Sequence, residues 1–152
     1  MNKLELKIPP PVVAIAVGAI MWGLSRAGIG AASAGGSITA AAVIALIGLG
    51  IALSGNVAFH RARTTVNPFK PETASSLVTS GIYRFTRNPM YLGMFVALVG
   101  WAVFLANLLS AMTLLLFPLY ITRFQIQPEE RALLSLFGEP YASYMTRVRR
   151  WL

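Results

Sequence analysis

Two short polar stretches in this otherwise apolar chain carry the side chains that could do chemistry. The first, residues 77–93, reads LVTSGIYRFTRNPMYLG and stands directly before an apolar run, and the second, residues 123–130, reads RFQIQPEE. Together they supply cations, amides, phenols and a pair of acids: Tyr83, Arg84, Arg87, Asn88, Tyr91, Arg123, Gln125, Glu129 and Glu130. A cation opposite a carboxylate can hold both charged ends of a zwitterionic ligand such as an amino acid moiety. Aromatic and apolar walls nearby would suit a nucleobase or a lipid tail.

An ordinary structural interpretation of the same residues stays open on spacing alone. Arginines beside an apolar span anchor to lipid head groups, and tyrosines there belong to the aromatic belt. A pair of glutamates can simply mark the first turn of a helix. No metal site is expected, because the chain has no Cys, one His and five acidic residues, whereas zinc sites use three or four Cys, His or carboxylate ligands.

The composition indicates a membrane protein of one domain. The chain has 152 residues, of which 56% are hydrophobic and 12% are charged, against about 25% charged in soluble domains. The formal net charge is +8, and we expect these cations to flank the membrane spans and set their topology. We expect no nucleic-acid partner, because the basic residues do not alternate with aromatic residues as they do on such surfaces.

Four apolar segments approach or reach the roughly 17–25 residues that a helix needs to cross a bilayer. They lie near residues 9–25, 38–59, 90–106 and 108–124. We therefore predict an all-α membrane protein, a single domain over 1–152 with about four transmembrane helices, a loop at 61–88 and C-terminal amphipathic helices over 128–150. The first segment could instead be a signal peptide, because the Ala-Ser-Ala at 32–34 resembles a small-residue cleavage site.

Particular residues predict how the spans pack and where they break. Gly48, Gly50 and Gly55 would let another helix approach the second span closely. Asn107 marks a tight turn between the third and fourth spans, and Pro118 predicts a kink in the fourth. Because so short a turn joins two spans, they must be antiparallel neighbours, and the two polar stretches must then meet at one end of the bundle.

The distribution of cations predicts the orientation in the membrane. Of the 13 Lys and Arg residues, all but Arg26 fall within residues 1–7, 61–88 and 123–152. Positively charged loops face the cytoplasm. We therefore expect a multi-pass protein with both termini and the candidate site cytoplasmic, in contact with membrane lipid. Glycines on the apolar spans also make self-association into a homo-oligomer plausible.

The two polar stretches resemble the signatures of a known superfamily. GIYRFTRNPMYLG is similar to G-x-Y-x-x-x-R-H-P-x-Y-x-G of the isoprenylcysteine carboxyl methyltransferase and phospholipid N-methyltransferase superfamily. EERALLSLFGEPYASYMTRV resembles its second signature, E-E-x-x-L-x-x-x-F-G-x-x-Y-x-x-Y. The two occur in the family's order and cover residues 75–150, about half of the chain. The resemblance implies a helical membrane enzyme that binds S-adenosylmethionine on the cytoplasmic side and releases S-adenosylhomocysteine.

The resemblance also implies roles for individual residues. Those expected to bind the cofactor are Leu77, Val78, Tyr83, Arg87, Asn88, Pro89, Met90, Tyr91, Glu129 and Glu130. Glu129 would hold the ammonium of the cofactor and is one of two candidate catalytic residues. The other is Arg123, as a substitute for the substrate-side Arg that the carboxyl methyltransferases have where this chain has Gln125.

Two departures from the signatures bear on the reaction. The His of the first signature is Asn88 here, and an amide cannot titrate near pH 7, so we assign this position a binding role. With Gln125 in place of Arg, a lipophilic or small acceptor other than isoprenylcysteine is favoured. We predict methyl transfer from S-adenosylmethionine to such an acceptor. The alternative is a non-catalytic four-helix membrane scaffold or binding protein that keeps the fold.

Overall fold

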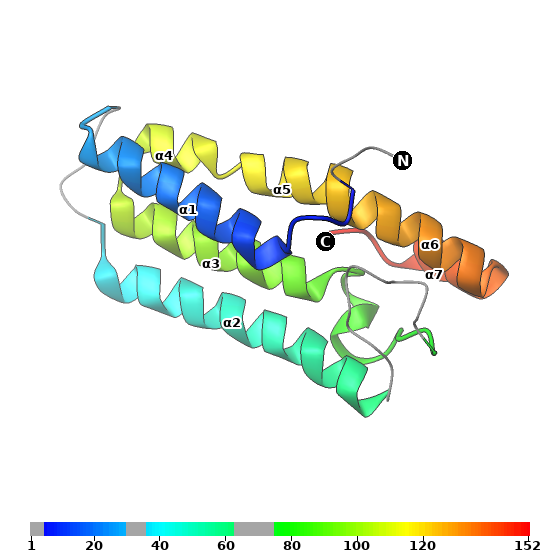
Figure 1. The fold of residues 1–152 in the computed structure, drawn as a ribbon. Helices are drawn as coiled ribbons and strands as arrows, with labels where there is room; N and C mark the ends of the chain where they lie inside the picture. Colours follow the sequence, from blue (N-terminus) through cyan, green and yellow to red (C-terminus); the bar gives the residue numbers. More distant parts are fainter. Residues whose placement is uncertain (1–4, 30–35, 63–74) are drawn as a thin grey trace.

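The computed structural model describes residues 5–29, 36–62 and 75–152, and within these ranges the regular structure is helical (Figure 1). The predicted all-α class is confirmed for these residues. The elements are α1 (Pro10–Arg26), α2 (Ile38–Arg61), the 3₁₀ turn η2 (Gly81–Arg84), α3 (Pro89–Leu105), α4 (Leu108–Thr113), α5 (Leu116–Ile121), the π turn η3 (Thr122–Ile126), α6 (Gln127–Phe137) and α7 (Glu139–Arg147).

Proline and asparagine define where the helices start and turn. Pro10 in α1 and Pro89 in α3 lie in the first turn, where a missing N–H costs no hydrogen bond. The α3 helix ends at Ala106, which is left-handed (φ 47°, ψ 39°). Asn107 then starts α4 by accepting the backbone N–H of Ser110 on its side chain at 2.9 Å. The tight turn predicted at Asn107 is confirmed.

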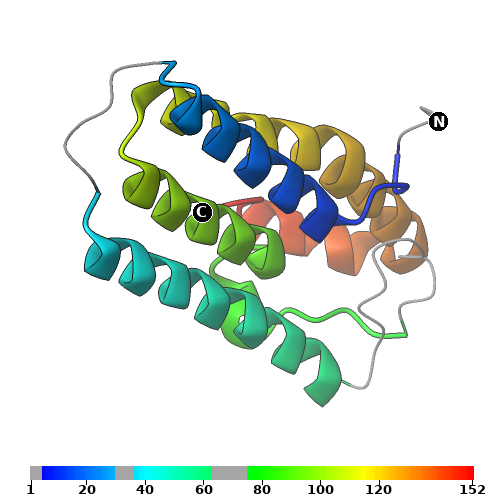
Figure 2. The same cartoon turned by 60° about the vertical axis from the view of Figure 1, so that its left-hand side comes forward.

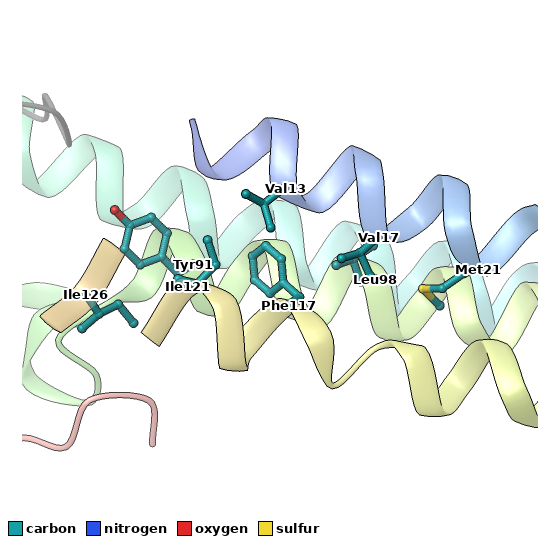
Figure 3. Packing of buried hydrophobic residues seen from close by; sticks show 8 residues of the cluster. All are labelled: Val13, Val17, Met21, Tyr91, Leu98, Phe117, Ile121 and Ile126. Atoms are coloured by element: carbon teal, nitrogen blue, oxygen red, sulfur yellow. The ribbon is translucent and has the colours of Figure 1, made fainter. Parts of the chain in front are cut away.

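The α3 helix lies at the centre of the bundle, with α2 on one side and α1 and the α4–α5 pair on the other (Figures 1 and 2). The main hydrophobic core lies where α1, α3 and α5 meet. Figure 3 shows its side chains between these helices: Val13, Val17, Met21, Tyr91, Leu98, Phe117, Ile121 and Ile126. Two hydrogen bonds to α1 carbonyls hold the layers together: Trp101 Nε1 donates to Gly18 O at 3.1 Å, and Ser110 Oγ donates to Met21 O at 2.7 Å.

Glycines bring α2 and α3 into backbone contact. A Cβ at Gly48 would lie 2.5 Å from the carbonyl oxygen of Gly93, and one at Gly55 would lie 2.9 Å from the ring of Pro89. Small residues allow this approach. The prediction for Gly48 and Gly55 is therefore confirmed, but it is wrong for Gly50, whose Cβ would meet nothing within 4 Å.

Pro118 interrupts the fourth apolar helix, one turn before its own position. Because Pro118 has no N–H to donate to the carbonyl of Leu114, that oxygen accepts the N–H of Phe117 instead, at 3.2 Å. The α4 helix ends at Thr113, and α5 begins at Leu116. The chain then continues as a helix through η3 into α6, so the C-terminal helix expected from residue 128 does not start after a loop.

Within the described part of the chain, two helices are long and apolar enough to cross a membrane: α2, with 24 residues, and the run Leu108–Phe137, with 30. The apolar helices α1 and α3 have 17 residues each, about 25 Å at 1.5 Å per residue. Large apolar side chains cover the outer surface of α2: Ile38, Val43, Leu46, Ile47, Leu49, Leu53 and Val57. Such a surface suits lipid rather than water. The number of spans stays a prediction, and residues 63–74 of the expected loop and 32–34 of the expected cleavage site lie outside the described residues.

Candidate functional site

A cavity of about 290 Å³ lies at the end of the bundle where α3 begins and α5 continues into α6. Its wall combines the start of α1, the end of α2, residues 76–78, the loop and first turns around the start of α3, and α6 with α7. Most of the lining side chains are apolar or aromatic, and a few are polar or charged. This combination is typical of a small-molecule site.

A carboxylate from α6 faces the first turn of α3. Tyr91 donates its hydroxyl hydrogen bond to Glu129 Oε1 at 2.6 Å, and Gln125 Nε2 donates to the same oxygen at 2.9 Å. Gln125 belongs to the π turn η3, and π turns occur frequently at functional sites. The two polar stretches therefore meet, as the short α3–α4 connection predicts.

Glu129 is partly buried and lines the cavity. It stands on α6, beyond the apolar part of the preceding helix. Burial raises the pKa of Glu129 to about 7, and hydrogen bonds from Tyr91 and Gln125 oppose this rise because they favour the ionised form. The negative charge of Glu130 adds to the rise. A cationic ligand beside this carboxyl group would stabilise its ionised form and lower its pKa.

A guanidinium lies on the same wall. Arg87 Nη2 pairs with Glu130 Oε1 at 2.9 Å, and the two side chains are only 8% and 10% exposed. The other nitrogens of Arg87, Nε and Nη1, are buried and have no hydrogen-bond partner among the described residues. Buried donors without partners are costly, so the three N–H groups on these two nitrogens have hydrogen-bonding capacity left for an anion.

The tyrosines of this end of the bundle fix the wall around the charged groups. Tyr83, in η2, stacks edge-to-face on Phe59 of α2, with the ring centroids 5.3 Å apart. Tyr144 of α7 donates its hydroxyl to the carbonyl of Tyr83 at 2.7 Å. Burial raises the pKa values of Tyr83 and Tyr144 above the ordinary value, so both are neutral donors at physiological pH.

Residues 148–152, which we call the C-terminal strap, lie across the loop before α3. The N–H of Arg87 donates to the carbonyl of Arg149 at 3.1 Å, and Asn88 Nδ2 donates to the carbonyl of Arg150 at 2.8 Å. Trp151 Nε1 donates to Thr122 Oγ1 at 3.1 Å. Asn88 is thus oriented by the main chain, and the binding role predicted for it stays a prediction.

The cavity brings together nine of the ten residues predicted to bind the cofactor. They are Leu77, Val78, Tyr83, Arg87, Asn88, Met90, Tyr91, Glu129 and Glu130. The tenth, Pro89, begins α3 and packs against Gly55 instead. Their roles toward a ligand stay predictions.

Arg123, the second candidate catalytic residue, does not line this cavity. Its side chain is 47% exposed and pairs with Glu5 Oε1 at 3.1 Å, while Arg131 holds Glu5 Oε2 at 2.8 Å. The catalytic role of Arg123 stays a prediction, and its observed contact anchors the segment that leads into α1.

Sequence reasoning missed several lining residues: Pro10, Pro11, Phe59, Ser76, Met94, Ile126, Leu133, Phe137, Tyr141 and Tyr144. The two tyrosines of α7 stand in the second motif, where their spacing could have identified them. The N-terminal prolines gave no such signal, because their place in the wall depends on how α1 packs in three dimensions.

Comparison with known proteins identifies the family. Residues 37–140 match the family described as phospholipid methyltransferase. The chain belongs to this family. Relatives with curated names include the protein-S-isoprenylcysteine O-methyltransferase of Schizosaccharomyces pombe, 40% identical over 75 residues that make up 47% of this chain and 30% of that protein. The human enzyme of the same name is 37% identical over 73 residues, 48% of this chain and 26% of that protein.

Two further matches extend over more of this chain. A probable protein-S-isoprenylcysteine O-methyltransferase of Oryza sativa subsp. indica is 36% identical over 112 residues, 72% of this chain and 58% of that protein. A solved structure of a eukaryotic intramembrane Ras methyltransferase, isoprenylcysteine carboxyl methyltransferase, aligns with a TM-score of 0.55 and 25% identity, over 100% of this chain and 53% of that one. The chain thus spans 26–58% of the length of these named relatives.

Proposed function

We propose that this chain transfers a methyl group from S-adenosylmethionine to a lipophilic acceptor at the membrane surface. One observation carries the proposal: the same cavity is lined by Glu129 and by Arg87, whose Nε and Nη1 are buried and have no hydrogen-bond partner among the described residues. The amino acid end of S-adenosylmethionine has an ammonium and a carboxylate, which these two side chains would hold. The family and the names of the relatives support the same reaction class.

Glu129 and Arg87 would bind opposite ends of that zwitterion. Both hydrogen bonds to Glu129 end on Oε1, and a carboxylate can accept about four, so capacity remains for an ammonium. Arg87 offers its free N–H groups to a carboxylate, a charge-assisted geometry that favours Arg over Lys. Tyr83 and Val78 line the cavity and are buried, which suits them to the wall beside the adenosine.

The chemistry would require mainly positioning from the protein. When bound, S-adenosylmethionine supplies an activated methyl group on its sulfonium, so the transfer needs no metal. The side chains of the cavity would align the reacting atoms and exclude water, effects that supply a large part of the acceleration in such reactions. Asn88 donates a hydrogen bond from its side-chain amide to the carbonyl of Arg150. Because an amide does not titrate near pH 7, we keep for Asn88 a binding role and no proton transfer.

A second cavity supports a lipophilic acceptor. A groove of about 680 Å³ runs between α1 and α3, and it shares Pro11 and Met94 with the wall of the first cavity. Its other lining residues are all apolar or small: Ala14, Ile15, Gly18, Ala19, Trp22, Ala97, Leu98 and Trp101. A hydrocarbon chain lying in this groove would bring its polar end to the first cavity. We place the first cavity, and the end of the groove that meets it, near the cytoplasmic face of a multi-pass protein, following the distribution of cations.

Calorimetric titration of the detergent-purified protein with S-adenosylhomocysteine tests the proposal. We expect saturable binding that the Glu129→Ala substitution abolishes. The Glu139→Ala protein is the matched control, because Glu139 is exposed at the start of α7 and lies outside the cavity wall. Absence of binding by folded wild-type protein would refute the proposal and favour a non-catalytic scaffold.

A further inference from the structure

Glu130 is shared between two arginines, and the sharing is unequal. Arg150 engages both of its carboxylate oxygens, with Nη2 to Oε2 at 2.6 Å and Nε to Oε1 at 3.0 Å. Arg87 reaches only Oε1, through Nη2 at 2.9 Å. The Arg150 contact has the two-point geometry that guanidinium–carboxylate pairs prefer. The charge of Glu130 is therefore committed mainly to Arg150.

The group formed by Arg87, Glu130 and Arg150 carries one net positive charge. Arg87 and Glu130 alone would form a neutral pair, and Arg150 adds one positive charge. Arg87 lines the cavity and is 8% exposed, whereas Arg150 lies behind Glu130, does not line the cavity and is 35% exposed. Any attraction of an anion to Arg87 therefore depends on how fully Arg150 neutralises Glu130 from the outer side.

The backbone around Arg150 is held so that its side chain cannot easily leave. Its carbonyl accepts hydrogen bonds from Asn88 Nδ2 at 2.8 Å and Thr86 Oγ1 at 3.4 Å. On one side the carbonyl of Arg149 accepts the Arg87 N–H, and on the other the indole N–H of Trp151 donates to the hydroxyl of Thr122 in η3. A surface salt bridge usually loses much of its value to side-chain entropy, and this strap reduces that loss.

We infer that Arg150 is a positioning residue for the anionic end of the ligand. By pairing with Glu130, it leaves Arg87 with the charge and the free N–H groups needed to bind a carboxylate. The inference rests on the proposed function and deepens it. It predicts that Arg150 controls how strongly the site distinguishes a ligand with a carboxylate from one without it, although Arg150 touches neither.

The test compares two ligands that differ in this one group. S-adenosylhomocysteine carries the carboxylate, and 5′-S-(3-aminopropyl)-5′-thioadenosine lacks it. The wild type should bind the first more tightly by about tenfold or more, the value of a charge-assisted hydrogen bond. The Arg150→Gln protein should lose most of this preference, while its affinity for the amino-only ligand changes by less than about twofold. Arg149→Gln is the matched control, because Arg149 is the exposed neighbour in the same strap.

A second variant separates the electrostatic role from a purely structural one. The Glu130→Gln/Arg150→Gln double substitution removes both charges, leaves Arg87 unopposed and should restore the preference for the carboxylate. The inference would be overturned, and the proposed function left intact, by either of two results. Arg150→Gln could lower the affinity for both ligands equally, or the double variant could fail to regain the preference for the carboxylate. Binding of neither ligand by the wild type would overturn both.

Discussion

The hydroxyl of Tyr91 is the most specific point at which the proposed cofactor site can be perturbed. Its hydrogen bond to Glu129 is short, at 2.6 Å, and it favours the ionised carboxylate, which lowers the pKa of Glu129. Tyr91→Phe removes this one donor and keeps the ring in the core between α1, α3 and α5. The pKa of Glu129 should therefore rise further above its present value.

The size of the effect follows from the energy of the lost bond. A hydrogen bond to a charged group contributes about 1.5 kcal/mol at the lower end of its range, which corresponds to about one pKa unit. With the pKa of Glu129 moved from about 7 to about 8, its ionised fraction at pH 7 falls from about one half to about one eleventh. Affinity for a ligand with an ammonium group should fall about fivefold at pH 7, and the deficit should nearly vanish by about pH 9.

Titration calorimetry with S-adenosylhomocysteine between pH 6 and 9 measures this prediction. The amino group of the ligand also loses its proton near pH 8, but it does so equally for both proteins, so the ratio of the two affinities is the quantity to follow. Tyr120→Phe is the control, because it removes a buried hydroxyl that has no hydrogen-bond partner among the described residues. A ratio that stays constant across this pH range, whether at one or at five, would refute the reasoning.

Two substitutions of glycine test the packing and the groove. Gly93→Leu should force α2 and α3 apart, because the new side chain would meet the backbone of α2. Such overpacking costs about 1–3 kcal/mol. In thermal unfolding in detergent, this protein should have a lower midpoint than the Gly50→Leu control, in which the new side chain faces open space. Gly18→Leu should fill the groove between α1 and α3 and lower turnover of long-chain acceptors without changing affinity for S-adenosylhomocysteine. Gly23→Leu on the same helix, with nothing within 4 Å of its Cβ, should leave turnover unchanged, and equal losses in both variants would contradict this use of the groove.

The sequence allowed the helices, the hairpin and about half of the cavity wall to be predicted, because these features follow from local rules and from the two motifs. Proline in a first turn, asparagine as a cap and a short connection determine how α3 and α4 meet. The error at Gly50 was avoidable. Gly48 and Gly55 are seven residues apart and share one face of a helix, whereas Gly50 is two residues from Gly48 and faces away from that side.

The C-terminal strap could not have been predicted in the same way. Residues 148–152 follow no helical period, and the contacts of Arg150 are made with residues 20 positions away in α6 and 62 away before α3. A run of basic residues beside a membrane span predicts topology. It does not predict which of the arginines forms a partly buried ion pair. Arg149 and Arg150 are neighbours, yet the first is exposed and the second pairs with Glu130.

The helical run from α5 to α6 explains how segments far apart in the sequence come to build one wall. Pro128 has no N–H to donate to the carbonyl of Phe124, and this carbonyl accepts the backbone N–H of Leu6 at 3.0 Å instead. Glu5, paired with Arg123 and Arg131, fastens the same segment to the helix. This segment leads directly to Pro10 and Pro11, which line the cavity. The carbonyl that Pro128 leaves without a helical hydrogen bond therefore helps to hold this part of the cavity wall. The exposed arginines that hold Glu5 therefore contribute to the shape of a cavity that they do not touch.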